Sequence, residues 1–183
     1  MPLRIWISSF DGPWGLVWIC SSEKGVCGVS LRGPREELER DLKRRKECEV
    51  REDQAPNRKV MDEIRQYLAG ERRAFDIELD LWGTEFQVRV WDLLRSIPYA
   101  QTRSYGELAH ALGLPKAARA VGGAAGSNPV PLLVPCHRLI RRDGGLGGFG
   151  CGLDIKRFLL SLEARVSLSS GGSEKVWEKG RRG

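Results

Sequence analysis

The sequence is short of the features that mark metal-binding, secreted or membrane proteins. It has only two histidines, His110 and His137, and no Cys-x-x-Cys pair, so the usual ligand spacing of a structural zinc site is missing. Five cysteines cannot all pair within one chain. The longest apolar run near the N-terminus, Leu16 to Cys20, cannot span a bilayer, and no signal peptide is recognisable. We therefore expect no metal, no membrane role, and a location in the cytoplasm of a prokaryote or the nucleus of a eukaryote.

What the chain does have is length and positive charge. Its 183 residues, 41% of them hydrophobic, suffice for one large domain or two small ones with a real core. The net charge is +6, which permits a polyanionic partner such as nucleic acid but does not establish one.

The N-terminal part, residues 5 to 33, has the pattern of antiparallel strands broken by turns. If SSEKG closes a hairpin, Cys20 and Cys27 face each other across it, either as two small buried hydrophobes or as a disulfide. Two amphipathic helices follow, one containing Leu38 and Leu42 and the other Ile64 and Leu68. Residues 75–81 alternate like a further strand.

The composition changes at Trp82 and Gly83, where Ala, Gly and helical patterns take over. We expect an α+β protein with an N-terminal antiparallel-sheet domain over residues 1–80 and a mostly helical C-terminal domain over residues 81–165. Residues 166–183 are rich in Ser, Gly and charge, which predicts a disordered tail.

Two short helices in the C-terminal domain have the helix-turn-helix pattern. Ser104 and Glu107 form a capping box that opens a helix to Leu112, and a second helix is expected over residues 116–125. This second helix, with the sequence AARAVGGAAG, has Arg119 as its only long side chain. Glycine is costly inside a helix, so its presence indicates close packing, close approach to a ligand, or both on opposite faces.

The segment VPCHRLI carries the residues best suited to chemistry. Cys136 is nucleophilic as a thiolate, which requires a base, and His137 stands next to it. Because neighbours do not share a face of a helix or strand, a bridging water would have to link them, with Glu163 orienting the histidine. The alternative is a buried cysteine beside a structural histidine. Six glycines between Gly144 and Gly152 predict a mobile lid or pocket wall.

The segments PCHRLI and RAVGGAAGSNP, with the glycine-rich segment after them, resemble the O6-alkylguanine-DNA alkyltransferase family. The similarity continues upstream through GTEFQVRVWDLLRSIPYAQTRSYGELA and downstream through LGGFGCGLDIKRFLLSLE, covering about residues 83–163 with the motifs in the same order. The N-terminal part resembles the family only in general character; there the family fold implies a domain like ribonuclease H.

The resemblance implies a single-use repair protein that acts as a monomer without a cofactor. It would bind the minor groove of double-stranded DNA without regard to sequence and flip the damaged base into a pocket. Cys136 would then take and keep the alkyl group from O6 of guanine, and by extension from O4 of thymine. His137 would be the water-linked base, Glu163 its orienting partner and Asn128 a brace beside the active-site turn.

The resemblance also places residues against DNA and around the alkyl group. Arg119 would fill the vacated base stack, and Tyr105 would contact the flipped nucleotide. The further DNA-binding residues implied are Ser104, Ala118, Ala120, Gly122 and Gly123. The pocket would be lined by Tyr105, Pro131, Val134, Leu139, Phe149, Gly150, Cys151 and Lys156. Phe149 stands where the family commonly has tyrosine, and Cys151 leaves the size of the accepted group open.

Three other functions fit parts of the pattern. A lesion-binding relative without transfer would lack the cysteine, but Cys136 is present. A Cys-His hydrolase would need a distant histidine, and His110 is the only other one. A helix-turn-helix regulator would carry several base-reading side chains on its second helix, where this chain has Arg119 alone.

Overall fold

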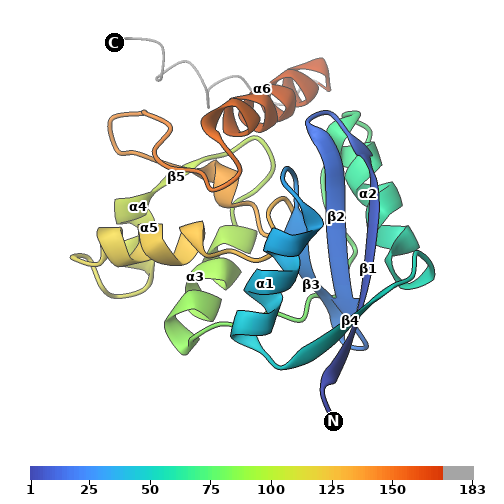
Figure 1. Cartoon of the computed structure of the whole chain (residues 1–183). Helices are drawn as coiled ribbons and strands as arrows, with labels where there is room; N and C mark the ends of the chain where they lie inside the picture. Colours follow the sequence, from blue (N-terminus) through green and yellow to red (C-terminus); the bar gives the residue numbers. More distant parts are fainter. Residues whose placement is uncertain (171–183) are drawn as a thin grey trace. The chain divides into compact units, whose positions relative to one another are not determined.

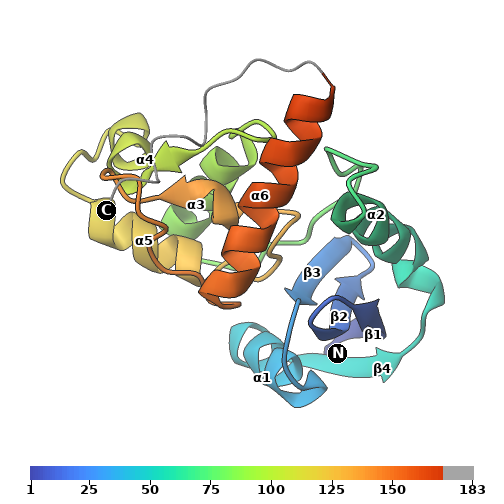
Figure 2. The same cartoon turned by 90° about the horizontal axis from the view of Figure 1, so that it is seen from above.

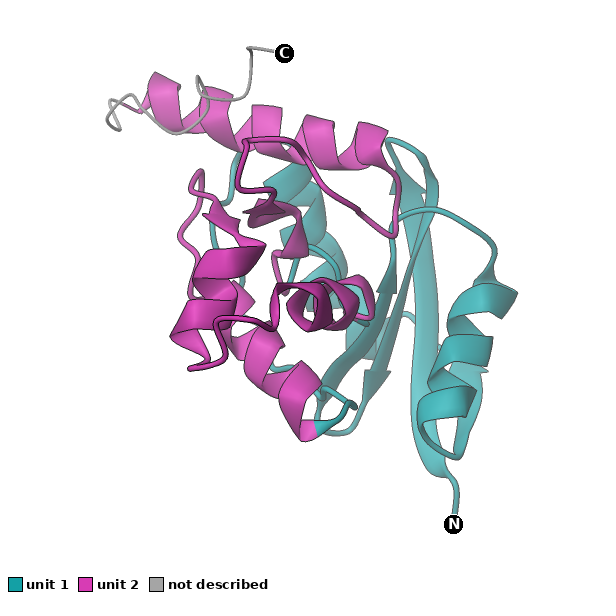
Figure 3. Cartoon of the chain, turned by 90° about the vertical axis from the view of Figure 1, so that its left-hand side faces the viewer, with its two compact units in different colours: residues 1–84, 129–133 teal, residues 85–128, 134–183 magenta. Residues whose placement is uncertain are grey.

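The computed structural model describes residues 1–170, so the tail expected after that point lies outside the described residues. The chain divides into two compact units (Figure 3). Unit 1 comprises residues 1–84 and 129–133, and unit 2 comprises residues 85–128 and 134–183. Within residues 1–170, no helix is both long and apolar enough to cross a membrane.

Unit 1 is built on a four-stranded sheet in the order β3-β2-β1-β4 (Figure 1). The strands β1 (Leu3–Gly12), β2 (Gly15–Ser22) and β3 (Gly25–Ser30) form the predicted antiparallel meander. A fourth strand, β4 (Cys48–Glu52), pairs in parallel with β1. Gly25 has a φ of +147° at the second hairpin, and a Cβ there would lie 2.5 Å from the carbonyl oxygen of Glu78, so only glycine fits.

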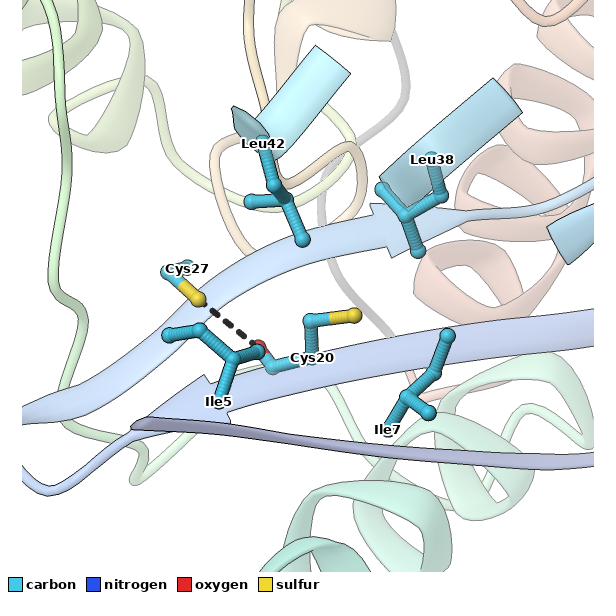
Figure 4. Packing of buried hydrophobic residues seen from close by; sticks show 6 residues of the cluster. All are labelled: Ile5, Ile7, Cys20, Cys27, Leu38 and Leu42. Atoms are coloured by element: carbon cyan, nitrogen blue, oxygen red, sulfur yellow. Dashed lines mark hydrogen bonds between the residues drawn. The ribbon is translucent and has the colours of Figure 1, made fainter. Parts of the chain in front are cut away.

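Helices α1 (Arg35–Arg45) and α2 (Arg58–Leu68) cover opposite faces of this sheet (Figures 1 and 2), and the short helix η1 (Ala55–Asn57) leads into α2. The predicted apolar stripe of α1 is confirmed, because Leu38 and Leu42 are its buried residues. They join a buried cluster with side chains of the sheet (Figure 4), namely Ile5, Ile7, Cys20 and Cys27.

Cys20 and Cys27 are free thiols, so the disulfide alternative is not realised. The sheet pairs Cys20 with Gly28 rather than with Cys27, whose Sγ lies 3.4 Å from the carbonyl oxygen of Cys20. Burial raises the pKa of Cys27 to about 12 and raises that of Cys20 as well. Both residues therefore act as small hydrophobes.

The prediction of a strand over residues 75–81 is wrong. That segment touches the sheet at one isolated bridge, between Val26 and Leu79, closed by bonds from Val26 N to Glu78 O (2.9 Å) and from Asp80 N to Val26 O (2.9 Å). Alternation shows that a segment is half-buried, but a ladder also requires a partner edge that runs alongside it.

Unit 2 is mostly helical, as expected. It contains α3 (Glu85–Arg95), α4 (Tyr105–Ala111), α5 (Ala118–Gly126), the one-turn helix η2 (Cys136–Arg138) and α6 (Leu153–Ser169). Two short strands, β5 (Arg103–Ser104) and β6 (Leu139–Ile140), pair in parallel. Helix α6 continues to Ser169, so the prediction that a disordered tail begins at residue 166 is wrong for residues 166–169. These residues are rich in serine, but they continue the last turns of the helix.

The helix-turn-helix is formed by α4 and α5. The predicted capping box is confirmed: Ser104 Oγ accepts from Glu107 N (3.2 Å) and Glu107 Oε2 accepts from Ser104 N (2.6 Å). Gly113, with a φ of +74°, opens the connection to α5. Trp91 of α3 holds α5, because its buried Nε1 donates to Ala124 O at 2.8 Å.

Candidate active site

Cys136 opens the single turn of η2, which explains how two reactive neighbours can share one short segment. The turn is closed by a bond from Arg138 N to Pro135 O (3.0 Å), after which Leu139 enters β6. The geometry is therefore that of neither a strand nor a regular helix. Cys136 is 9% exposed and His137 is fully buried. Val134 and Leu139, expected around the thiol, are buried on either side of it in the chain.

Asn128 holds the turn and the thiol together. Its Nδ2 donates to Val134 O at 2.8 Å and lies 3.2 Å from Cys136 Sγ. Burial raises the pKa of the Cys136 thiol, while the bond from Asn128 and the charge of Lys156 oppose that rise. The resting side chain is thus a thiol, and it needs a base to become a nucleophile.

His137, Glu163 and Arg138 form one buried cluster between η2 and α6. Nε2 of His137 lies 2.7 Å from Glu163 Oε1, and the guanidinium of Arg138 meets both carboxylate oxygens at 2.8 to 3.1 Å. Arg138 also donates to Ile97 O at 2.7 Å, and Ala100 N donates to Glu163 Oε2 at 2.9 Å. The carboxylate therefore accepts from a ring, a guanidinium and the backbone.

This cluster sets the protonation of its members. Burial opposes ionisation of Glu163, but the bonds and charges of His137 and Arg138 outweigh it and bring its pKa down to about 2. Burial lowers the pKa of His137 despite the neighbouring carboxylate. A neutral imidazole that donates from Nε2 to Glu163 has its lone pair on Nδ1, so Nδ1 is the atom that can accept a proton.

Tyr105 begins α4 and lies against the glycine-rich segment. A Cβ on Gly147, whose φ is +68°, would come within 2.4 Å of the Tyr105 hydroxyl oxygen, so the absence of a side chain there makes room for the phenol. Burial raises the pKa of Tyr105, although a hydrogen bond with the backbone of Gly148 opposes the rise. The phenol therefore keeps its proton and can donate it.

Lys156 ties the glycine-rich segment to the active-site strand. Its side chain is fully buried, and its Nζ donates to the carbonyl oxygens of Leu139 (2.6 Å), Gly148 (3.1 Å) and Leu146. Burial lowers its pKa to about 8, while the nearby Cys136 acts in the opposite direction. The residue anchors the segment predicted to be a lid, and its charge favours the thiolate.

Helix α5 exposes the residues expected to meet DNA. Arg119, Ala120 and Gly123 are exposed, and Ala118 and Gly122 are partly so. A Cβ on Gly122 would make only ordinary contact with Tyr105, at 3.5 Å, and a Cβ on Gly123 or Gly126 would meet nothing within 4 Å. Packing within the unit therefore does not require these glycines, which favours the second explanation offered by the sequence, close approach to a ligand.

The remaining predicted pocket residues are not all brought together. Phe149 and Cys151 are half-buried and Gly150 is exposed, all within the segment between β6 and α6. A Cβ on Gly150 would lie 3.8 Å from Gly126 O, which places that glycine beside the end of α5. Pro131 belongs to unit 1.

Sequence reasoning missed Arg138 and the backbone of Ala100. An arginine inside the apolar segment VPCHRLI was the available signal, because a buried guanidinium needs a carboxylate partner. The role of Ala100 had no such signal. It adopts a φ of +61°, a conformation that non-glycine residues rarely take, and this aims its N–H at Glu163.

Together, the fold and the site define a two-unit protein that joins a helix-turn-helix to a buried thiol with a histidine–carboxylate pair behind it. Two family models match the chain: "6-O-methylguanine DNA methyltransferase, ribonuclease-like domain" over residues 5–81, and the DNA binding domain of the same name over residues 85–165. The chain belongs to the 6-O-methylguanine DNA methyltransferase family.

Relatives extend the match over nearly the whole chain. A methylated-DNA–protein-cysteine methyltransferase of Methanosarcina acetivorans is 42% identical over 84% of this chain and 95% of its own length. An inducible one of Bacillus subtilis is 41% identical over 91% and 93%. The chain in the crystal structure of Mycobacterium tuberculosis OGT in complex with DNA is 38% identical in sequence to this one. The two structures superpose with a TM-score of 0.77 over 90% of this chain and 94% of that one.

Proposed function

We propose that this protein repairs O6-alkylated guanine in double-stranded DNA by moving the alkyl group to Sγ of Cys136, once per molecule. The observation that carries the proposal is the buried thiol of Cys136, held by Asn128 and followed directly by the His137–Glu163 pair. The names of its relatives, which describe methyl transfer from DNA to a protein cysteine, support the same reaction.

In this reaction, Nδ1 of His137 takes the thiol proton through a bridging water, and Glu163 stabilises the imidazolium that forms. The thiolate attacks the alkyl carbon, the bond from that carbon to O6 breaks, and its electron pair stays on guanine. Guanine then takes up one proton while the imidazolium of His137 gives up the thiol proton, so the products are a thioether, an ordinary base and a neutral histidine. A thioether offers no good leaving group to water or to another nucleophile of the site, so the transfer is irreversible and stoichiometric.

Guanine leaves more easily if its developing charge meets a hydrogen-bond donor. Tyr105 suits this role, because its raised pKa keeps the phenol protonated. A backbone N–H near Gly150 is a second donor for O6. The same arrangement would accept O4-alkylthymine, whose alkylated oxygen is chemically equivalent, as a second substrate.

The target base has to leave the duplex, since a thiol inside the protein cannot reach a stacked base. We propose that α5 enters the minor groove, which is only about 6 Å wide, and that its Ala and Gly surface permits this approach. The exposed Arg119 fills the space left by the base. With no other base-reading side chain on α5, binding is independent of sequence. The protein acts as a monomer wherever duplex DNA lies, in the cytoplasm of a prokaryote or the nucleus of a eukaryote.

The alternative functions find less support. His110 is exposed on α4 and does not belong to the buried cluster. A Cys-His hydrolase would therefore have no distant catalytic histidine and would have to use His137, the neighbour of Cys136. A regulator that reads bases would need more than Arg119 on α5. Simple lesion binding leaves the Cys136 cluster without a role.

Mass spectrometry after incubation with a duplex containing O6-methylguanine tests the proposal. We expect one added methyl group on Cys136, no turnover beyond one equivalent, and no adduct on Cys136→Ser. Repeated turnover, or an adduct on Cys151 alone, would overturn it.

A further inference from the structure

A side chain of α3 reaches the end of α5, immediately before the residue that contacts the thiol. Gln87 Nε2 donates to Ser127 Oγ at 3.1 Å. We propose that Gln87 is a positioning residue for alkyl transfer. By holding Ser127, it keeps Nδ2 of Asn128 beside Sγ of Cys136. The inference rests on the proposed function and adds to it a residue that acts on the thiol only through others.

Helix α5 needs support from outside because its own sequence is a weak helix former. Three of its nine residues are glycine, and each glycine costs about 1 kcal/mol relative to alanine. A Cβ on Gly123 or Gly126 would meet nothing within 4 Å, so side-chain packing at these positions does not compensate for that cost. The last carbonyl groups of a helix also lack partners within it. The final turn of α5 therefore depends on bonds from other elements.

Helix α3 supplies two of these bonds from one of its faces. Gln87 and Trp91 are four residues apart, so their side chains leave α3 on the same side, one turn apart. The buried Nε1 of Trp91 donates to Ala124 O at 2.8 Å, and the hydroxyl of Ser127 donates to the same oxygen at 2.8 Å. The amide of Gln87 donates in turn to that hydroxyl. Ser127 is thus fixed both as a donor and as an acceptor.

The end of α5 leads directly into the contact with the thiol. The main chain of Asn128 continues the last turn, because its N–H donates to Ala125 O at 3.2 Å. Its side chain donates to Val134 O at 2.8 Å and lies 3.2 Å from Cys136 Sγ. Hydrogen bonds weaken steeply with misalignment, so a small rotation of this turn is enough to loosen the contact with the thiol. Loss of the Gln87 amide should therefore affect Cys136.

The titratable groups that act on the thiol lie on other elements. They are Lys156 on α6, His137 beside the thiol on η2, and Tyr105 at the start of α4. A neutral substitution at Gln87 changes none of these charges. A shift in the pH dependence of transfer in such a variant would therefore report the geometry of the Asn128 contact.

The test follows methyl transfer from the free base O6-methylguanine by mass spectrometry, because a free base needs no contact between α5 and DNA. Gln87→Met keeps the length of the side chain but removes the donor. We expect it to slow transfer about tenfold at pH 7, within the roughly hundredfold that a displacement of about an ångström can cost. The pH of half-maximal rate should rise, because the bond from Asn128 opposes the effect of burial on the pKa of Cys136.

A double-mutant cycle separates positioning from general stability. In an Asn128→Ala background, Gln87→Met should change the rate by less than about twofold, because the contact through which it acts is already gone. Ser127→Ala removes the acceptor of the same bond and should reproduce the effect of Gln87→Met. Ser127→Thr keeps the hydroxyl and should transfer faster than Ser127→Ala.

Arg89→Met is the matched control on α3. It removes a different bond from this helix, the one to Leu112 O at 3.4 Å at the end of α4, and it should keep the wild-type rate. Thermal unfolding of every variant shows whether the fold is intact. If Gln87→Met does not fold, Ser127→Ala in both backgrounds decides the question in its place.

Equal slowing by Gln87→Met with and without Asn128, or a pH profile that does not move, would overturn the proposal while leaving the repair function standing. Alkylation of Cys136 by iodoacetamide, mapped by peptide mass spectrometry, reports on the thiol without any repair substrate. If the wild-type protein gained no methyl group, the repair function would be lost. A rise in the pH at which iodoacetamide reacts in Gln87→Met would then still support the positioning of the thiol, and an unchanged pH would overturn it as well.

Discussion

Nε2 of His137 lies 2.7 Å from Oε1 of Glu163, and neither side chain is exposed to solvent. The same carboxylate accepts hydrogen bonds from two guanidinium nitrogens of Arg138. One buried negative charge therefore pairs with both the imidazole of His137 and the guanidinium of Arg138. This shared carboxylate links the chemistry of η2 to the stability of unit 2, because it cannot be changed without affecting both.

Glu163→Gln is therefore expected to destabilise the protein by about 3–5 kcal/mol, because it leaves the guanidinium of Arg138 buried without its counter-charge. Urea unfolding measures the loss. The double variant Arg138→Leu/Glu163→Gln should recover part of it, since the unpaired charge is then gone. If the single variant had the same urea midpoint of unfolding as the wild-type protein, the cluster would not contribute to stability.

The pH dependence of stability follows from the lowered pKa values of the same pair. The pKa of Glu163 is lowered from 4.5 to about 2, so its contribution, about 3 kcal/mol at most, is complete above pH 4.5 and disappears as the pH falls through 2. His137 also has a lowered pKa, so only the unfolded chain takes up its proton below about pH 6.5, which again favours unfolding in acid. Stability should thus rise with pH from 2 to about 6.5, and Glu163→Gln should flatten the lower part of that curve.

Much of the fold could be predicted because periodicity reports burial directly. The meander of unit 1, the stripe of α1 and the cap of α4 all follow from local patterns. The segment around Leu79 could not, because alternation does not say whether a partner edge is available along its length. The return of Pro129–Leu133 to unit 1, where Pro129 O accepts from Val29 N at 2.8 Å, is a long-range contact without any local pattern.

The site divides in a similar way. Cys136 and His137 are reactive side chains in a short motif, so the sequence points to them directly, and the resemblance supplies Glu163 from the far side of the glycine-rich segment. Arg138 was overlooked because its role depends on burial, and Ala100 because its role lies in its backbone.

Asn128→Asp should make the thiol less reactive at neutral pH. The change keeps the size of the side chain but removes the Nδ2 donor that lies 3.2 Å from Sγ, and it adds a negative charge beside a developing thiolate. The pKa of Cys136 then rises further, so the rate of alkyl transfer should reach half its maximum at a higher pH than in the wild-type protein. Asn128→Ala, which removes the donor alone, should move the profile less. An unmoved profile in both variants would show that Asn128 does not act on the thiol.

Gly147→Ala should impair transfer by displacing Tyr105. The added Cβ would lie 2.4 Å from the phenol oxygen, and alanine at a φ of +68° adds about 1–2 kcal/mol of backbone strain. A shift of the phenol by about an ångström can slow a reaction up to a hundredfold. Gly148→Ala is the matched control, since its Cβ meets nothing within 4 Å. Single-turnover rates on a methylated duplex compare the two, and equal rates would show that the position of Tyr105 does not matter.

Gly123→Ala separates what α5 needs for its own stability from what it needs to approach DNA. A Cβ there meets nothing within 4 Å, and alanine favours a helix interior over glycine by about 1 kcal/mol, so the melting temperature should rise. If the exposed surface of α5 enters the minor groove, the same methyl group should weaken duplex binding severalfold, whereas transfer from a free O6-alkylguanine base should keep its rate. An alanine at Gly106, whose Cβ would meet only Ser104 Oγ at 3.9 Å, tests a glycine of α4 in the same way and should not affect duplex binding. A Gly123→Ala protein that is more stable and binds duplex DNA as tightly as the wild type would exclude α5 from the groove.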